Sequence, residues 1–436
     1  MSLSMSVRAQ VFDWMTIAGS IGTIGASDGI STNALFANPQ GIAVDSGGNV
    51  FVADQDNSVI RKISLVSSNW QVETIAGSPG IAGASDGTGG AALFNNPQGI
   101  AVDSSGNMFV ADTANSTIRK ILSVGGNWMV TTIAGQSGVN ISRDGTNSNA
   151  GFKYPCGITT DASGNIYVAD TQGFSIRKLI HSGSDWVVTT LAGKANSSGY
   201  KDGSNSVARF QAPFGIAVQA NGTIFISDGG SCNIRKISNS GTNWVVTTIA
   251  GANGIYSFVD GTNTAALFNF PQGIATDVAG NLYVADTGNN TIRKLSLQGT
   301  NWVTTTVAAE SEDPSVFSPA VSGGDDGVAG AAHFNRPTGI CLTTNGLIFV
   351  SDTFNYTVRQ AYPMPVIQYV SLAGSQVNVS WSAVSGLNYQ LQYTTALNPA
   401  AWTNSGATQQ ATNSILTFAD TPGGDTQRFY RVSVVP

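Results

Sequence analysis

The chain is poor in the residues that most often carry chemistry. Its 436 residues include two histidines, three cysteines and three glutamates. Zinc held in a protein channel needs several imidazoles, and His181 and His333 are too few. Cys156, Cys232 and Cys341 form no Cys-x-x-Cys pair and are widely spaced. The sequence therefore predicts neither a zinc site nor a disulfide framework.

Long apolar runs and an excess of positive charge are also missing. No run of about 18 apolar residues is present, so we expect no membrane span. The net charge is −6, which argues against a nucleic-acid partner held through its phosphates. Hydrophobic residues make up 42% and charged residues 11%, and there are 51 glycines. This composition excludes bulk disorder and is typical of a β protein rich in tight turns.

Six copies of one sequence unit fill most of the chain. The phrase Pro-x-Gly-Ile-Ala-Val-Asp…Val-Ala-Asp…Ile-Arg-Lys starts at Pro39, Pro97, Pro155, Pro213, Pro271 and Pro337. The first four steps between these prolines are 58 residues and the last is 66, which places an eight-residue insertion before the final unit. A fixed period of this size with strand-like content indicates a propeller or a solenoid.

Each unit predicts a four-stranded antiparallel meander. In the second unit the strands are expected over 99–103, 108–112, 117–121 and 128–133, and a Gly/Asn-containing turn joins the first two. A single sheet of this kind cannot bury both of its faces, whereas sheets arranged radially bury one another. The Phe that recurs in each crossing segment is expected to fill the space between neighbouring sheets.

The two ends of the repeat array predict a closed ring. Residues 14–19 match the fourth strand of a unit, but no first three strands precede them in the sequence. The last unit stops after its third strand, over 357–362. An N-terminal strand that completes the last blade would close the ring and cover an exposed edge. We therefore expect a six-bladed β-propeller over 14–362.

The Asp and Arg-Lys pairs of every unit are expected to be structural. A residue that each blade needs identically serves the blade, because Asp can accept hydrogen bonds from turn amides and Arg can reach a carbonyl or carboxylate. We assign these repeated residues no role in binding.

The repeated phrase resembles the NHL-repeat family. Residues 96–120, Asn-Pro-Gln-Gly-Ile-Ala-Val-Asp-Ser-Ser-Gly-Asn-Met-Phe-Val-Ala-Asp-Thr-Ala-Asn-Ser-Thr-Ile-Arg-Lys, are close to that family's pattern. The resemblance extends over about residues 14–362 and implies a six-bladed propeller. Because the family includes protein-binding, RNA-binding and a few catalytic members, the resemblance implies an architecture and not an activity.

A different β pattern follows the repeats. Residues 363–436 alternate polar and apolar side chains over 376–381, 389–393, 415–418 and 428–434. This tail resembles a short fibronectin type III-like β-sandwich that lacks an edge strand. Similar modules stand at the C-termini of many secreted proteins of environmental bacteria. That resemblance implies a secreted, cell-surface or periplasmic location.

The N-terminal segment, residues 1–13, has two open interpretations. Val7-Arg-Ala9 has small residues at the last and third-last positions, as a signal-peptidase site requires, but a charged start and a full apolar stretch are absent. The segment is either the remnant of a signal peptide or an ordinary disordered start.

Candidate binding residues appear where the units depart from their common pattern. The long fourth-to-first strand connections and the second-to-third strand turns are expected to share one face, which we call the top face. Units three to six place aromatic or basic residues there, where other units have small polar ones. The predicted binding residues are Arg143, Lys153, Tyr154, Phe174, Lys201, Phe214, Phe270, Arg336, Phe354 and Tyr356.

These side chains suit stacking on a sugar ring or gripping a peptide or an anionic polymer. The alternative is that the aromatic residues pack beneath their own loops. The insertion over 310–322 is interpreted as either a lid over this face or a disordered excursion.

The sequence predicts an exported, non-enzymatic binding or adhesion protein with a glycan or protein ligand and no cofactor. A metal-dependent lyase or lactonase is the first alternative, since six-bladed enzymes of these classes hold Zn or Ca in the central channel. Calcium bound there through Asp and Asn remains open. RNA binding by the basic residues of the top-face loops is the second alternative.

Overall fold

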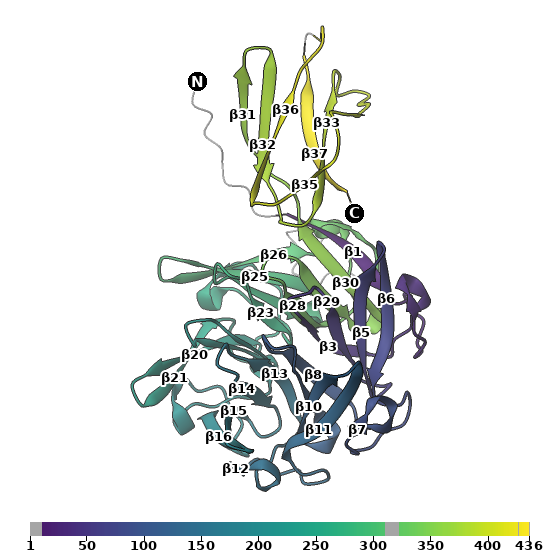
Figure 1. Cartoon of the computed structure of the whole chain (residues 1–436). Helices are drawn as coiled ribbons and strands as arrows, with labels where there is room; N and C mark the ends of the chain where they lie inside the picture. Colours follow the sequence, from purple (N-terminus) through teal and green to yellow (C-terminus); the bar gives the residue numbers. More distant parts are fainter. Residues whose placement is uncertain (1–10, 310–321, 426, 436) are drawn as a thin grey trace. The chain divides into compact units, whose positions relative to one another are not determined.

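The computed structural model describes residues 11–309, 322–425 and 427–435 (Figure 1). Contacts divide the chain into two compact units. The larger contains Trp14–Thr344 and Ile348–Ala361, and most of the smaller is Tyr362–Pro436. The larger unit consists of six five-stranded antiparallel sheets. The predicted all-β fold and the six-bladed propeller are confirmed.

The second blade shows the order that all blades share. It runs from β8 (Pro97–Val102) through β9 (Met108–Asp112) and β10 (Thr117–Val124) to β11 (Asn127–Gly135), and a short strand β7 (Gly87–Thr88) pairs outside β11. The four-stranded meander is confirmed, but the prediction of only four strands was wrong.

The extra outer strand follows from the recurring Asp-Gly. The Asp86 carboxylate accepts hydrogen bonds from the backbone N–H of Thr132, at 3.0 Å, and from its Oγ1, at 2.8 Å. This attachment holds the next two residues, Gly87 and Thr88, in register with β11.

The other blades follow the same order, with the short outer strand first. The first blade contains β2 (Gly29–Ile30), β3 (Pro39–Val44), β4 (Val50–Asp54), β5 (Val59–Val66) and β6 (Asn69–Ala76). The third contains β12 (Gly145–Thr146), β13 (Pro155–Thr160), β14 (Ile166–Asp170), β15 (Ser175–Ser182) and β16 (Asp185–Gly193). The fourth contains β17 (Gly203–Ser204), β18 (Pro213–Val218), β19 (Ile224–Asp228), β20 (Asn233–Ser240) and β21 (Asn243–Ala250). The fifth contains β22 (Gly261–Thr262), β23 (Ile274–Thr276), β24 (Leu282–Asp286), β25 (Thr291–Gln298) and β26 (Asn301–Ala308).

Short 3₁₀ turns stand at two positions of the blade. One kind follows the outer strand: η1 (Ser31–Asn33), η2 (Gly89–Ala91), η4 (Asn147–Asn149), η5 (Asn205–Val207), η7 (Asn263–Ala265) and η9 (Ala329–Ala331). The other joins the second and third strands: η3 (Thr113–Asn115), η6 (Gly229–Ser231), η8 (Thr287–Asn289) and η10 (Thr353–Asn355).

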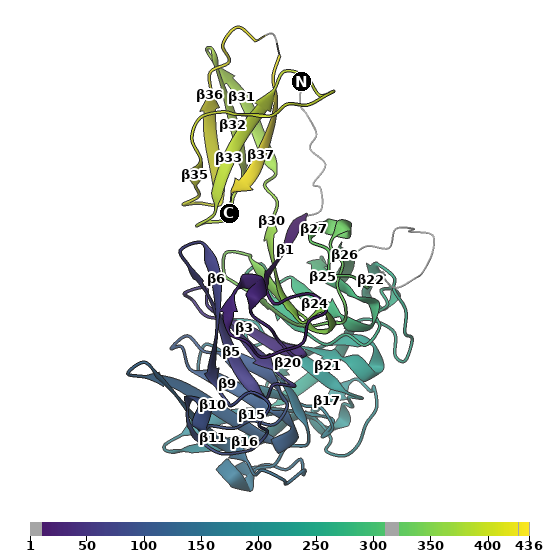
Figure 2. The same cartoon turned by 90° about the vertical axis from the view of Figure 1, so that its right-hand side faces the viewer.

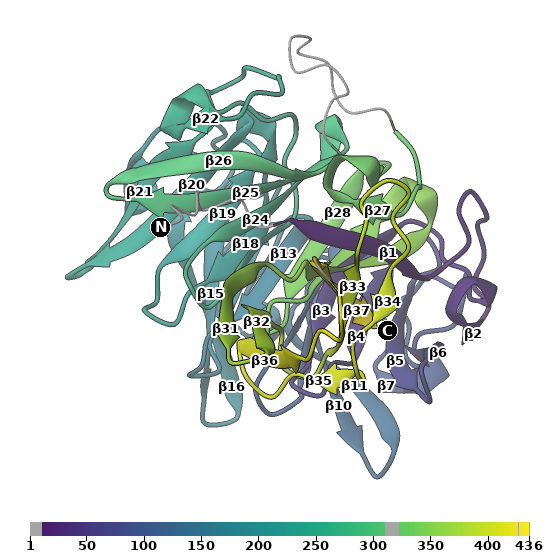
Figure 3. The same cartoon turned by 90° about the horizontal axis from the view of Figure 1, so that it is seen from above.

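The N-terminal strand closes the ring. β1 (Phe12–Ala18) lies between β27 (Gly327–Val328) and β30 (Thr357–Pro363), and β29 (Ile348–Asp352) and β28 (Pro337–Leu342) complete the sixth sheet. The purple β1 lies among green strands from the other end of the repeat array (Figures 2 and 3). Trp14 is buried, and its ring meets that of Phe334 edge-on at 5.1 Å. The predicted closure is confirmed.

The repeated Arg and Asp are structural, as predicted. In the second blade, the Arg119 guanidinium bonds Asp112 and Asp86, both at 2.8 Å, and lies over the Phe94 ring at 5.1 Å. Burial raises the pKa of Asp112, and Arg119 opposes that rise. The equivalent arginines are fully buried in every blade: Arg61, Arg119, Arg177, Arg235, Arg293 and Arg359.

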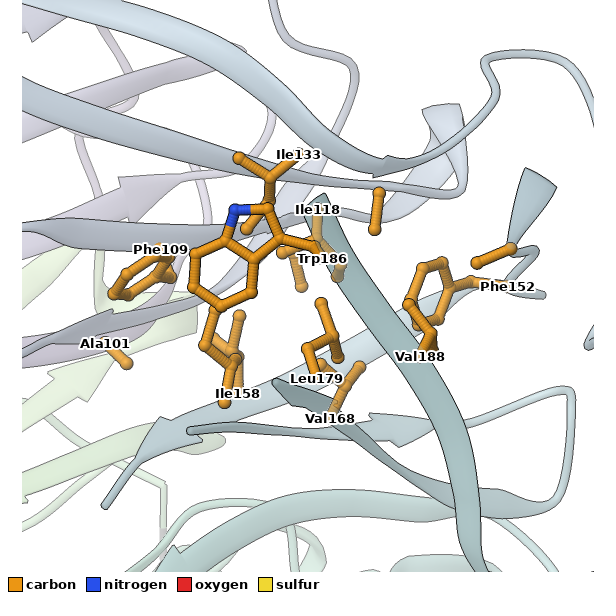
Figure 4. Packing of buried hydrophobic residues seen from close by; sticks show 14 residues of the cluster. Ala101, Phe109, Ile118, Ile133, Phe152, Ile158, Val168, Leu179, Trp186 and Val188 are labelled. Carbon is orange, nitrogen blue, oxygen red and sulfur yellow. The ribbon is translucent and has the colours of Figure 1, made fainter. Parts of the chain in front are cut away.

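Neighbouring blades share hydrophobic clusters. Between the second and third blades, the fully buried Phe152 of the crossing segment packs with residues of both sheets (Figure 4). Phe109 of the second blade meets Trp186 of the third edge-on at 5.9 Å. The predicted role of the recurring Phe between adjacent sheets is confirmed.

The C-terminal unit has two small sheets. One contains β31 (Ile367–Ala373), β32 (Gln376–Ser382) and β36 (Ile415–Asp420). The other contains β33 (Asn388–Thr394), β34 (Thr403–Asn404), β35 (Gln409–Gln410) and β37 (Phe429–Val435). Trp381, Tyr389 and Leu391 lie in the core of this unit. Its fibronectin type III-like character stays a prediction.

Two predictions fall outside the described residues. They concern the signal-peptide remnant within residues 1–10 and the insertion, of which residues 310–321 are not described. In the described ranges, the structure contains no helix that is long and apolar enough to cross a membrane.

Candidate functional site

The two kinds of loop that depart from the repeat meet on one face. The N–H of Gly254, in the connection to the fifth blade, donates to the carbonyl of Ser231 in the second-to-third strand turn of the fourth blade, at 3.0 Å. Gly80 and Asn57 make the same contact between the first blade and the connection to the second, also at 3.0 Å. The top face therefore contains both loop types, as the sequence predicted.

A narrow channel opens at the centre of this face. Six glycines surround it because the inner strands of successive blades touch there. A Cβ on Gly99 would lie 2.0 Å from the Cys156 carbonyl oxygen of the next blade. The isoleucines that follow these glycines line the same space, whose volume is about 100 Å³.

The channel wall offers little to a metal ion. The residues at its mouth are Gln40, Gln98, Cys156, Phe214, Gln272 and Thr338. Burial raises the pKa of the Cys156 thiol to about 12, which keeps it protonated and a poor ligand. Across the described ranges, no group of three His, Cys, Asp or Glu residues is placed to hold a metal ion.

The two histidines lie away from the channel and belong to separate local contacts. The His181 ring packs at 4.8 Å against Trp186. The Nδ1 atom of His333 lies 3.1 Å from the Asp325 carboxylate.

A larger hollow of about 560 Å³ adjoins the channel mouth at the fifth and sixth blades. We call it the top-face hollow. It brings together three predicted binding residues, Phe270, Arg336 and Phe354. The rest of its lining consists of Gln40, Tyr256, Asn269, Gln272, Thr287, Gly288 and Thr338.

Aromatic rings and one guanidinium shape the hollow. The Arg336 guanidinium carbon lies over the Phe354 ring, 5.2 Å from its centre. Phe270 meets Phe214, a further predicted residue, with ring centres 5.2 Å apart and an interplanar angle of 62°. Phe354 is 43% exposed and Tyr256 57% exposed. These rings therefore keep surface open to a ligand.

Two residues of the hollow have a left-handed backbone conformation that is unfavourable for large side chains. Phe270 has φ of 52° and Arg336 has φ of 50°. The first two units place Asn38 and Asn96 at the same position with φ of 51° and 50°. Asn tolerates this left-handed region, whereas for a bulky side chain it is strained. The third unit has Tyr154 there with φ of 51°, so the third, fifth and sixth units all retain large side chains where the backbone favours asparagine.

The polar groups of the hollow are mainly neutral. Within the described part of the chain, the side-chain amides of Gln40 and Gln272 have no hydrogen-bond partner. The Asn269 amide donates to the Gly288 carbonyl at 3.2 Å. Arg336 is the one charged residue of the lining. The hollow therefore combines apolar surface with hydrogen-bonding groups and a single positive charge.

The other predicted residues lie outside the lining of the hollow. Lys201 borders a separate depression of about 690 Å³ together with Tyr200 and Arg209. Arg143 is exposed and donates from Nε to the Asn149 carbonyl at 2.7 Å. The remaining four, all exposed or half-buried, are Lys153, Tyr154, Phe174 and Tyr356.

The sequence interpretation missed several residues of the hollow. Tyr256 stands in a crossing segment where the units differ in most positions, so no repeated residue marks it as a departure. Gln40 and Gln272 stand at a position where three of the six units have Gln, so the repeat does not mark them as departures. Only the closure of the ring brings Gln40 of the first blade beside Thr338 of the sixth.

The comparisons with known proteins agree with this architecture. The family model described as NHL repeat matches residues 36–63, 94–121, 268–295 and 334–360, which confirms the NHL repeats predicted from the sequence. "Protein SUPPRESSOR OF QUENCHING 1, chloroplastic" of Arabidopsis thaliana is 30% identical over 296 residues, 64% of this chain and 27% of that protein. "NHL repeat-containing protein 2" of Gallus gallus is 28% identical over 356 residues, 74% of this chain and 46% of that protein.

The chain thus spans less than half the length of these two relatives. Among solved structures, an auxiliary nutrient binding protein from Bacteroides thetaiotaomicron superposes with a TM-score of 0.60 at 16% identity. The match covers 83% of this chain and 78% of that one. At this identity the likeness shows the fold alone.

Proposed function

We propose that this chain, which carries NHL repeats, is a non-catalytic binding protein that takes a carbohydrate in the top-face hollow. The observation that carries the proposal is the hollow itself, in whose lining Phe270, Arg336 and Phe354 lie together. A non-glycine residue in the left-handed region costs of order 1–3 kcal/mol, and such strain concentrates at functional sites. Asparagine serves the fold at the same position in two other blades, and Tyr154 adopts the same conformation outside the hollow, so Phe270 and Arg336 are distinguished by lining the hollow and not by strain alone.

The lining matches the surface of a sugar. A sugar ring has an apolar C–H face and a rim of hydroxyl groups, and binding sites for such ligands combine aromatic walls with a few placed polar groups. Phe270, Phe354 and Tyr256 supply the walls, and the free amides of Gln40 and Gln272 supply donors and acceptors. The volume of about 560 Å³ is within the usual range for ligand pockets.

Binding without catalysis is the simplest account of these groups. General acid–base catalysis needs a side chain that can exchange a proton near neutral pH, such as a carboxyl or an imidazole. The described lining contains amides, hydroxyls, aromatic rings and one guanidinium. The printed name of the superposed Bacteroides protein, an auxiliary nutrient binding protein, also favours a binding role.

We further propose that the protein acts outside the cytoplasm, at the cell surface or in the periplasm. The C-terminal unit would serve as a spacer or attachment module, which its resemblance to fibronectin type III-like modules supports. Labelling of intact cells with an impermeant reagent tests this location.

The proposed function is tested by screening the protein on a glycan array and measuring hits by calorimetry. Phe270→Asn should abolish binding while keeping the fold, because asparagine is the residue that other blades use there. Tyr154→Asn is the matched control, since it makes the equivalent change at the same repeat position, with φ of 51°, outside the hollow. Tyr154→Asn should bind as the wild type does.

Two results would overturn this function. One is Phe270→Asn protein that binds every glycan as tightly as the wild type. The other is a protein that binds no glycan and carries near one equivalent of Ca or Zn after purification without chelator, which would favour a channel-metal lyase or lactonase.

A further inference from the structure

Among the described residues, Arg336 differs from the other arginines of the propeller in that its guanidinium has no hydrogen-bond acceptor. Each repeated arginine is buried between carboxylates, as Arg293 is between Asp286 and Asp260, at 2.9 and 2.7 Å. Over the described ranges, no carboxylate lies within 4.0 Å of the Arg336 guanidinium, and its recorded contact is with the Phe354 ring. This exposed cation therefore has no counter-charge among the described residues of the hollow.

The other top-face arginines use their donors within the loops, mainly on backbone carbonyls, and Arg209 Nε also donates to the Ser197 hydroxyl at 3.2 Å. Arg143 donates to the Asn149 carbonyl, and Arg209 donates to the carbonyls of Val207 and Ala208 at 3.1 and 2.7 Å. Those contacts fix neighbouring loops. Arg336 instead has its backbone fixed, because its N–H donates to Asn290 Oδ1 at 2.9 Å, while its five side-chain N–H donors remain available.

The position over Phe354 favours an anionic ligand at the edge of the guanidinium. A cation over an aromatic ring is held there by the ring's quadrupole, which limits where the side chain points. The N–H groups at the rim of the planar guanidinium match the two oxygens of a carboxylate and bind them in pairs. A neutral sugar would offer the guanidinium hydroxyl acceptors without an opposite charge.

We infer that the ligand of the top-face hollow is an acidic saccharide whose anionic group pairs with Arg336. The inference rests on the proposed carbohydrate function and narrows its ligand class. The sugar ring lies against Phe270 and Tyr256, and its hydroxyl groups meet the amides of Gln40 and Gln272. The anionic group is the carboxylate of a uronic acid or a sulfate ester, since both present paired oxygens to a guanidinium.

The test compares matched oligosaccharides by calorimetry on the full chain. Oligogalacturonate should bind at least ten-fold more tightly than neutral galactose oligomers of the same length, and its affinity should fall as salt rises. Arg336→Gln should remove this preference, so that the variant binds the acidic and the neutral oligomer with the same affinity. Arg143→Gln, which also removes a top-face arginine, should keep the preference, and the melting temperature should show that both variants fold.

The outcomes separate this inference from the proposed function. Equal affinity of the wild type for neutral and acidic oligomers would overturn the inference and leave carbohydrate binding intact, whereas binding of neither would overturn both. Sulfated galactose oligomers distinguish the two sources of charge, and a preference for either anion that depends on Arg336 supports the inference. Tight binding of a single-stranded oligoribonucleotide that Arg336→Gln abolishes, with no saccharide bound, would overturn it in favour of a phosphate polymer.

Discussion

Replacing Trp14 by alanine tests whether the N-terminal strand holds the ring closed. Trp14 is 1% exposed and lies in β1, the strand that joins the start of the chain to its last blade. Its indole packs edge-on against Phe334 at 5.1 Å. The substitution removes the largest buried side chain of β1 and leaves its backbone pairing with β30 in place.

The expected loss follows from this burial. Truncating a buried Trp or Phe to alanine costs about 3–5 kcal/mol through lost transfer free energy and the cavity left behind. An edge-to-face aromatic pair accounts for about 0.5–1.5 kcal/mol of this value. Because domains have a net stability of about 5–15 kcal/mol, Trp14→Ala should lose a large share of the propeller's stability.

The assay is urea unfolding followed by circular dichroism, with the free energy of unfolding compared at a common m-value. Ile24→Ala is the matched control, because Ile24 is 61% exposed and its loss should change stability by less than about 0.5 kcal/mol. The double variant Trp14→Ala and Phe334→Ala should lose less than the sum of the two single losses. A loss below about 1 kcal/mol for Trp14→Ala would refute the view that β1 holds the last blade.

Three further predictions concern the backbone, the channel and pH. Tyr154→Asn should raise the free energy of unfolding by about 0.5–1 kcal/mol in the same urea assay, because asparagine tolerates the left-handed conformation and Tyr154 is 37% exposed; a loss would contradict this. Gly99→Ala should lose more than about 2 kcal/mol, since its Cβ would overlap the next blade, while Gly90→Ala, with its nearest contact at 3.7 Å, should not. Burial raises the pKa of Asp54, Asp286 and Asp352 to about 6. Because the folded state then binds these protons more tightly than the unfolded chain, the melting temperature should increase as the pH is lowered from 8 to 5. A decrease over this range would contradict the raised pKa of these three residues.

Much of the fold was predictable because each unit repeats its structural residues. Arg119 recurs with Asp112 and Phe94 at fixed spacing, and the structure shows that the Arg119 guanidinium contacts both of them. The two-residue outer strand escaped prediction, since Gly87 and Thr88 are too short a segment to show any alternation. It forms through the long-range attachment of Asp86 to Thr132.

The site was predictable only where the repeat offered a comparison. Phe270, Arg336 and Phe354 were found because other units have small polar residues in their places, and the structure brings these three together. Tyr256 offered no such comparison. The hollow itself depends on which blades become neighbours and on the direction in which a loop side chain points. The sequence of a single repeat unit determines neither property.

The ring of glycines determines whether a ligand can pass through the central channel. A Cβ on Gly41, Gly157 or Gly339 would lie 2.0–2.2 Å from a carbonyl oxygen of the adjoining blade, so the inner strands touch around the whole circumference. The aperture therefore cannot dilate unless the ring itself breaks. A ligand bound in the hollow must leave by the face at which it arrived, and a partner on the opposite face binds without competing for the same space.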